Sequence, residues 1–121
     1  MRGRIALAAG DPGAALEWGT KALVASGADD LRVERANAHR LIGQARLARG
    51  EHEAATQALA QSLALDQALG LGARIQMDLE LLARAQEALG NRAAAQGYAS
   101  RAQAVSTALK EAAPGAQRRD P

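Results

Sequence analysis

Apolar residues recur along this chain at the spacing of an α-helix, and glycine-containing breaks interrupt them at regular intervals. Between residues 73 and 89, for example, one helical face carries Ile75, Leu79, Leu82, Ala83 and Gln86, as a period of about 3.6 residues requires. The breaks fall at residues 10, 26–30, 50, 70–72 and 90. The pattern predicts six helices, over residues 1–9, 12–26, about 30–49, 52–69, 73–89 and about 92–110.

The tight breaks carry residues that favour helix ends. Glycine readily adopts the left-handed conformation that follows many helices, which suits Gly10, Gly50 and Gly90. Asp11 is expected to cap the second helix with its side-chain oxygen. Pro12 then occupies the first helical position, where a backbone N–H is not needed.

The remaining helix ends are predicted in the same way. Asn91 is expected to repeat the capping role of Asp11, and Asp29 or Asp30 is expected to cap the third helix. Pro114 and Gly115 predict the end of the last helix. Residues 113–121 are therefore expected to form a disordered tail.

A repeated motif organises the chain. The skeleton Ala-x-Gly-x-x-x-Ala-Ala occurs at residues 8–15, 48–55 and 88–95, so its glycines lie 40 residues apart. Such a period is typical of stacked helical-repeat arrays, in which a single helical pair cannot bury its own apolar face. The motif predicts one domain over residues 1–112, made of antiparallel helix-turn-helix pairs. Their boundaries are 1–28, 29–70 and 71–112, and the first pair is truncated because its first helix is short.

Residues 42–66 resemble the tetratricopeptide repeat along most of their length. The family places a small residue seven positions before the turn glycine, an alanine five positions after it, and another small residue seven positions further on. Here these places hold Gly3, Gly43 and Ala83, then Ala15, Ala55 and Ala95, then Ala22, Ser62 and Ala102. The resemblance covers about residues 1–110, and it implies an all-α, right-handed superhelix of 2.5 to 3 repeats in which these small residues allow neighbouring helices to touch.

The chain departs from the family in two ways. Its period is longer than the usual value of about 34 residues, which is similar to the long-helix arrays of large bacterial transcription regulators and signalling proteins. Most of the consensus aromatics are missing, with Trp18 and Tyr98 at equivalent places and Ala58 between them. HEAT and armadillo repeats also fit a period of 40 residues, so such an array is an alternative. It does not predict the repeated small residues and turn glycines.

Composition restricts the functions that the chain can have. Fifteen basic and thirteen acidic residues leave a net charge of +2, and the basic residues are scattered, which does not favour nucleic-acid binding. There is no cysteine to form a disulfide or a thiolate metal site. Asp11 and Pro12 interrupt the apolar opening too early for a signal peptide, and no apolar run is long enough for a membrane span. A soluble, cytoplasmic protein with an alanine-rich core is expected.

Two stretches resemble catalytic or cofactor motifs without meeting their requirements. His52 and Glu53 begin a zinc-protease-like helix, but Thr56 stands where the second histidine ligand is needed. Gly70 and Gly72 precede a helix as in a dinucleotide loop, but the third glycine and the preceding strand are missing. The sequence therefore predicts no catalytic residue, no metal site and no cofactor.

The resemblance implies that partners bind on the concave face, which the first helix of each pair lines. The residues expected there are Asn37, Arg40, Leu41, Gln44, Met77, Glu80, Leu81 and Arg84. The apolar members and the two arginines suit a partner peptide or helix with apolar and acidic groups. The carboxylate grip of tetratricopeptide co-chaperones is not expected, because Gln44, Met77 and Leu81 replace its polar residues. Alternatively, these are ordinary solvated helix positions with Leu41 and Leu81 partly in the core.

The residues expected to serve repeat packing are Gly10, Gly43, Gly50, Ala55, Ala83, Gly90 and Ala95. A second function is self-association. In that case another copy of the chain would cover the truncated first repeat and the last helix, along the face that carries Ala95, Ala99, Ala102 and Leu109. The truncated first repeat also fits a fragment of a longer regulator or signalling protein.

Overall fold

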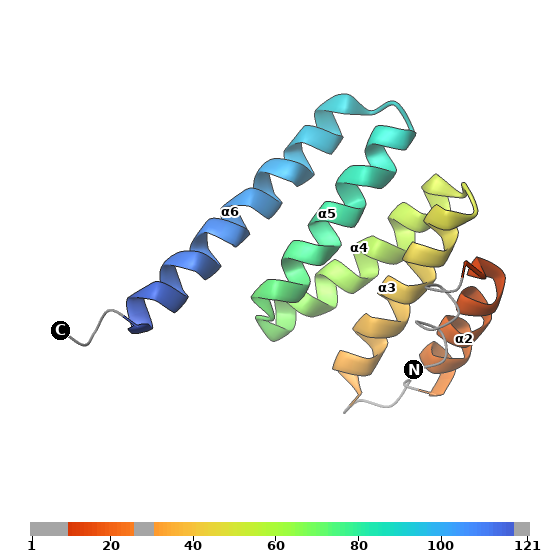
Figure 1. Ribbon diagram of the computed structural model, residues 1–121. Helices are drawn as coiled ribbons and strands as arrows, with labels where there is room; N and C mark the ends of the chain where they lie inside the picture. The colour runs from red at the N-terminus through yellow and green to blue at the C-terminus, as the bar shows by residue number, and fades with distance from the viewer. Residues whose placement is uncertain (1–9, 26–30, 118–121) are drawn as a thin grey trace.

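The computed structural model describes residues 10–25 and 31–117, and it gives residues 113–117 by their backbone alone. These residues form only helices and turns (Figure 1): α2 (Pro12–Ala25), α3 (Arg32–Ala48), α4 (His52–Leu69), α5 (Gly72–Ala88) and α6 (Arg92–Gln117). The all-helical prediction is therefore confirmed for this part of the chain. The short helix predicted over residues 1–9 lies outside the described residues.

Three of the helix ends share one hydrogen-bonded motif. Gly50, Gly70 and Gly90 have φ angles of 78°, 67° and 82°. The backbone N–H of the residue after each glycine donates to a carbonyl five residues earlier, in the pairs Glu51 to Arg46, Leu71 to Asp66 and Asn91 to Gln86. This is the Schellman arrangement, which satisfies carbonyls that the helix leaves without a partner. The left-handed glycines predicted at positions 50 and 90 are confirmed, as is Gly10 with a φ of 82°.

The helix starts agree with the sequence less closely. Oδ1 of Asp11 accepts a hydrogen bond from the backbone N–H of Ala14 at 3.0 Å, so the predicted cap of α2 is present. The capping position of α3 is Leu31, which makes no side-chain cap bond, and Asp29 and Asp30 lie outside the described residues. The side-chain amide of Asn91 donates to Oε1 of Gln86 at 2.9 Å.

The last helix is longer than predicted. The sequence predicts its end near Lys110, but α6 continues through Pro114 and Gly115 to Gln117. The expected disordered tail is therefore helical as far as residue 117, and residues 118–121 lie outside the described part. A proline fixes φ near the helical value. Because it has no backbone N–H, it cannot donate the usual helical hydrogen bond. Close to a helix end, where backbone groups lose their helical partners in any case, that loss is small.

Each described helix packs against the next along the chain, and α3 also contacts α5 (Figure 1). The larger core lies between α4, α5 and α6, and the smaller lies between α2 and α3. The larger contains Ala55, Leu59, Leu63, Leu79, Leu81, Leu82 and Ala102, and the smaller contains Ala15, Leu41 and Ala45. Leucine predominates in the larger core, and alanine supplies two of the three residues of the smaller one.

Small residues lie where helices touch, as the repeat pattern predicts. A Cβ atom on Gly43 would lie 2.5 Å from Cγ of Leu59, and one on Gly19 would lie 2.8 Å from Cγ1 of Ile42. Such distances are well below van der Waals contact, so α3 could not approach α4 and α2 as closely with larger residues there. Ala15, Ala55, Ser62, Ala95 and Ala102 are buried. Ala83 is half-buried and Ala22 is exposed, so these two positions pack less tightly.

Candidate functional site

Two hollows adjoin each other along α3 and α5. The first, of about 600 Å³, is lined by Gln44, Leu47, Ala48, His52, Leu81, Arg84, Glu87 and Ala88. The second, of about 540 Å³, is lined by Ala22, Ala25, Leu31, Glu34, Asn37, Ala38, Arg40, Leu41, Gln44, Arg74 and Met77. Gln44 belongs to both. We call the two hollows together the α3–α5 trough.

Most of the residues that the sequence assigned to a concave face lie in this trough. Asn37, Arg40, Leu41, Gln44 and Met77 line the second hollow, and Gln44, Leu81 and Arg84 line the first. Glu80 lines neither hollow; it is exposed and accepts a hydrogen bond from the Gln76 amide at 3.1 Å.

The apolar members of the trough differ in exposure. Leu41 and Leu81 are only 9% and 8% exposed, whereas Met77 is 43% exposed. The two leucines therefore belong to the core and present one side to the trough, as the alternative interpretation of the sequence expected. Among the large apolar side chains that line the trough, Met77 is the most open to a ligand.

Arg40 has a different environment from the one predicted. It is 8% exposed; its Nε atom donates to Oδ1 of Asp78 at 2.8 Å, and its Nη2 atom donates to Oδ2 of Asp66 at 2.7 Å. The guanidinium thus joins α3 to both α4 and α5. The expectation that Arg40 offers its charge to an acidic partner is corrected, because that charge is already paired inside the protein.

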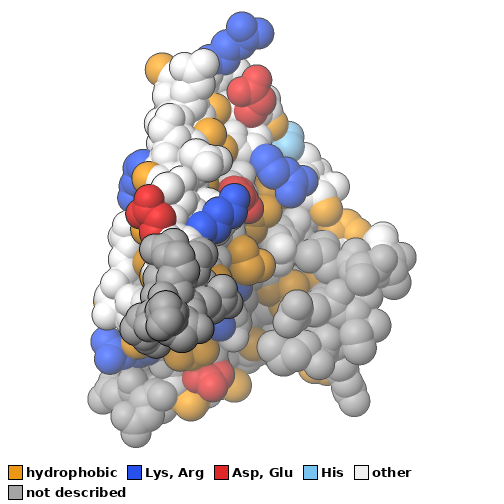
Figure 2. All heavy atoms as spheres, turned by 60° about the vertical axis from the view of Figure 1, so that its left-hand side comes forward, with side chains coloured by type: hydrophobic (Ala, Val, Ile, Leu, Met, Phe, Trp, Pro, Cys, Tyr) orange, Lys and Arg blue, Asp and Glu red, His pale blue; other side chains and the backbone are white. Residues whose placement is uncertain are grey.

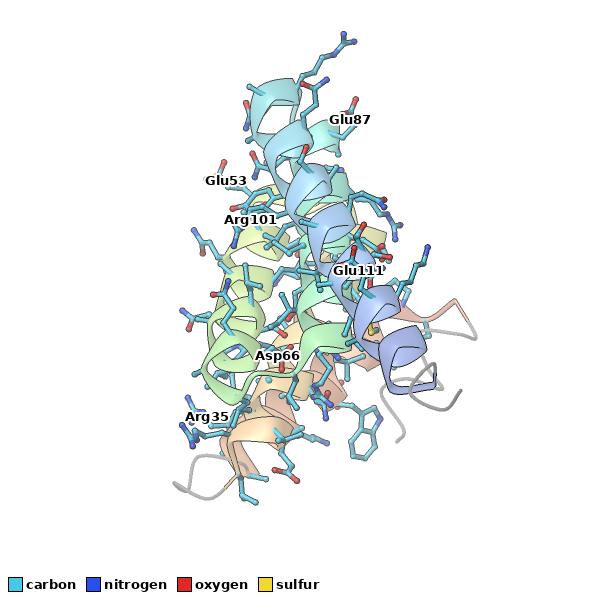
Figure 3. All side chains as sticks on the ribbon, turned by 90° about the vertical axis from the view of Figure 1, so that its left-hand side faces the viewer. Arg35, Glu53, Asp66, Glu87, Arg101 and Glu111 are labelled. Atoms are coloured by element: carbon cyan, nitrogen blue, oxygen red, sulfur yellow. The ribbon has the colours of Figure 1, made fainter. Side chains whose placement is uncertain are left out.

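A polar cluster surrounds this arginine. Ser62 donates to Oδ1 of Asp78 at 2.9 Å, and Nε of Arg74 donates to Oδ1 of Asp66 at 3.2 Å. Oδ1 of Asn37 accepts from both Arg40 and Arg74. Figure 3 shows Asp66 between the helices, while the labelled Glu53 and Glu87 lie at the periphery. Oδ2 of Asp78 is buried and has no hydrogen-bond partner among the described residues.

The two buried carboxyl groups have different proton affinities. Burial, followed by hydrogen bonding with Asp66, raises the pKa of Asp78 to about 7, although Arg40 and Ser62 oppose the shift. Burial would also raise the pKa of Asp66, but hydrogen bonding with Asp78 and the pairing with Arg40 and Arg74 lower it. At and below neutral pH, Asp66 therefore carries the negative charge of the pair and Asp78 tends to hold a proton.

The two histidines do not form a recognisable chemical site. Burial and then the nearby charge of Arg35 lower the pKa of His39. His52 lines the first hollow as the first residue of α4, and its Nδ1 atom is buried without a hydrogen-bond partner among the described residues. Within residues 10–25 and 31–117, no group of three His, Cys, Asp or Glu residues is placed to hold a metal ion.

The sequence analysis missed Asp66 and Asp78, but the sequence contains a signal for them. Asp66 follows Leu59 and Leu63 at helical spacing, and Asp78 lies on the stripe of Ile75 and Leu82. A carboxylate on an apolar stripe must find a buried partner or lose its charge. Two such aspartates on successive helices therefore point to a buried cation, which the structure identifies as Arg40.

The face of α6 that was predicted for self-association is largely occupied within the chain. Ala95 and Ala102 are 5% and 4% exposed, and Ala102 belongs to the larger core. Ala99 is exposed, and Leu109 is 37% exposed. A second copy would therefore have to use another face of this helix.

The surface and the helix composition agree with a mixed-charge chain. Basic, acidic and apolar side chains are interspersed on the face shown in Figure 2. None of the helices in the described part of the chain has the length and apolar content of a membrane span.

Comparisons with family models, curated proteins and solved structures find no match to this chain.

Proposed function

We propose that this chain is a tetratricopeptide-like helical-repeat module of the long-helix type, which binds a peptide or helix of a partner protein in the α3–α5 trough and has no catalytic role. The observation that carries the proposal is the trough itself. Its two hollows meet at Gln44 and extend along both helices, which gives it the elongated form that a peptide needs.

The helix contacts support a concave arrangement on this side. Among the described helices, α3 and α5 contact each other, whereas the alternate pairs α2 with α4 and α4 with α6 do not. In a curved stack, alternate helices approach each other on the inner side and separate on the outer side. The contact between α3 and α5 is therefore expected if these two helices form the inner row.

The chemistry of the trough favours an apolar segment with an acidic group. Leu47, Leu81 and Met77 provide apolar surface. Arg84 is exposed and has no hydrogen-bond or ion-pair partner among the described residues. A carboxylate of the partner would pair with this arginine, while Glu87 in the same hollow disfavours a second acidic group there.

Site-specific photo-crosslinking tests the proposal. A photoreactive residue at Gln44, which lines both hollows, is expected to form a defined adduct with a partner in native lysate. The same residue at Gln61, an exposed position on α4, is the matched control and is expected to form none. Equal crosslinking from both positions would exclude the trough as the binding surface.

Charge reversal then tests the role of Arg84. Arg84→Glu is expected to weaken binding of the crosslinked partner by about tenfold or more, because a favourable pair becomes a repulsive one. Arg101→Glu changes an exposed arginine on α6 (Figure 3) that lines neither hollow, and it should leave the affinity unchanged. If the two variants bind alike, the partner does not present a carboxylate to Arg84.

Self-association is the second candidate function. Within the described part of the chain, α6 contacts only α5, so the opposite side of this helix has no partner there. A second copy packed on that side would make a symmetric dimer. Light scattering over a concentration series measures this directly, and a constant monomer mass at high concentration would remove the candidate.

A further inference from the structure

The second hollow has the features of a small-molecule site. Its volume of about 540 Å³ lies within the range of about 300 to 1,000 Å³ found for ligand pockets. Six of the side chains that line it are apolar: Ala22, Ala25, Leu31, Ala38, Leu41 and Met77. The polar cluster around Arg40 forms one wall, and the side chain of Arg40 is more than nine-tenths buried. An apolar cavity with a few fixed polar groups is typical of a binding site for an amphiphilic molecule.

The polar wall offers hydrogen-bond donors that have no partner among the described residues. Arg74 donates through Nε and Nη2, and its Nη1 atom has no partner among the described residues. Arg40 and Arg74 both donate to Oδ1 of Asn37, so the amide orientation is fixed and Nδ2 is a donor without a partner in the described part of the chain. A guanidinium nitrogen and an amide nitrogen together suit the two oxygens of a carboxylate.

The charge balance of the wall also favours an anion. Arg40 and Arg74 are positive, and Asp66 is the carboxylate that both contact. Asp78 tends to hold its proton near neutral pH, because burial raises its pKa to about 7. Glu34 also lines the hollow, but it is exposed and its charge is screened by water. The buried side of the hollow therefore carries the excess positive charge.

We propose that the second hollow binds a small organic carboxylate with an aliphatic tail, with its carboxylate held by Arg74 and Asn37 and its tail between α2 and α3. The second hollow is part of the α3–α5 trough, and it shares Gln44 with the first. The polar anchors differ, however, because Arg74 and Asn37 would hold the acid and Arg84 would pair with a protein partner. Separate substitutions test the two anchors, so the two proposals can fail separately.

Isothermal titration calorimetry of the full chain tests the site with octanoate as the probe. We expect saturable binding that is at least about tenfold tighter than that of 1-octanol, which has the same tail without the charge, and tighter than that of octylammonium. Arg74→Gln should weaken octanoate binding by about tenfold or more. Arg101→Gln, an exposed position on α6 that lines neither hollow, is the control and should leave it unchanged.

A second variant keeps the test decisive if Arg74→Gln does not fold. Ala22 is an exposed residue of α2 that lines the hollow, so Ala22→Phe should fill the space without touching the polar cluster and should abolish octanoate binding. The proposal is overturned if octanoate and 1-octanol bind equally, if octanoate shows no saturable binding, or if the folded Ala22→Phe protein binds octanoate like the wild type.

Discussion

Nε of Arg40 on α3 donates a buried hydrogen bond to Oδ1 of Asp78 on α5, at 2.8 Å. The two residues are 38 positions apart, and the same guanidinium also pairs with Asp66 on α4 at 2.7 Å. One side chain therefore connects three successive helices at the wall of the α3–α5 trough. This arrangement makes the trough and the stability of the fold depend on the same residue.

Replacement of Arg40 should destabilise the fold strongly. Arg40→Met keeps most of the apolar volume of the side chain but removes the buried cation beside Asp66, which then keeps only the partly exposed Arg74, and the buried hydrogen-bond donor to Asp78. Loss of one partner from a buried ion pair typically costs about 3 to 5 kcal/mol. Urea denaturation followed by circular dichroism measures this change in the free energy of unfolding.

The matched control for this prediction is Arg84→Met. Arg84 is exposed, so its loss should change the free energy of unfolding by about 0.5 kcal/mol or less. An equal effect of the two substitutions would mean that the ion pairs of Arg40 contribute nothing to stability.

Asp78 should make stability depend on pH near neutrality. Its folded pKa of about 7 lies above the value of about 3.9 for an unfolded chain. Between these values the folded protein holds a proton that the unfolded chain has released, so stability falls as the pH rises through about 7. Asp78→Asn removes this titration and keeps a similar shape.

The measurement is the free energy of unfolding of the wild type minus that of Asp78→Asn, determined at several values between about pH 5 and pH 8. This difference should decrease as the pH rises toward about 7 and should level off above that value. His39, whose pKa is lowered, affects both proteins in the same way, and Asp66, whose pKa is also lowered, is charged throughout this range. A difference that stays constant would show that Asp78 does not titrate there.

Gly43 should tolerate no side chain. A Cβ atom at this position would lie 2.5 Å from Cγ and 2.6 Å from Cδ2 of Leu59, and Leu59 is completely buried. Gly43→Ala should therefore lower the free energy of unfolding by about 1 to 3 kcal/mol through overpacking, despite the better helix propensity of alanine.

Gly97→Ala is the comparison that isolates this contact. Gly97 lies within α6 and is exposed, and a Cβ atom added there would meet no side chain and no other helix of the described residues within 4 Å. Alanine should stabilise the protein there by about 0.5 to 1 kcal/mol, because it restricts the unfolded chain and favours the helix. Thermal melts of the two variants should shift in opposite directions. If both raise the melting temperature, Gly43 is not at a tight helix contact.

The helices could be predicted because their signals are local. The left-handed glycines at 50 and 90 and the small residue at 43 follow from spacing within a few turns of one helix. The helix end predicted at Pro114 was wrong, because a proline removes one hydrogen bond and does not by itself end a helix.

The polar cluster could not be placed in the same way. Arg40 and Arg84 are both arginines expected on the inner helices, yet one is buried and the other is exposed. Their difference arises from Asp66, which is 26 positions from Arg40, and from Asp78 on the next helix. Such a partnership depends on how the helices stack, which no short stretch of sequence records.

In a simple repeat array, each unit contacts only its neighbours and can unfold from the ends. The connection of α3, α4 and α5 through one guanidinium opposes such fraying, because separating any one of these helices would break at least one buried hydrogen bond of Arg40 with Asp66 or Asp78. These three helices should therefore unfold in a single cooperative transition. Their slowest amide protons should then exchange with solvent through the same opening event.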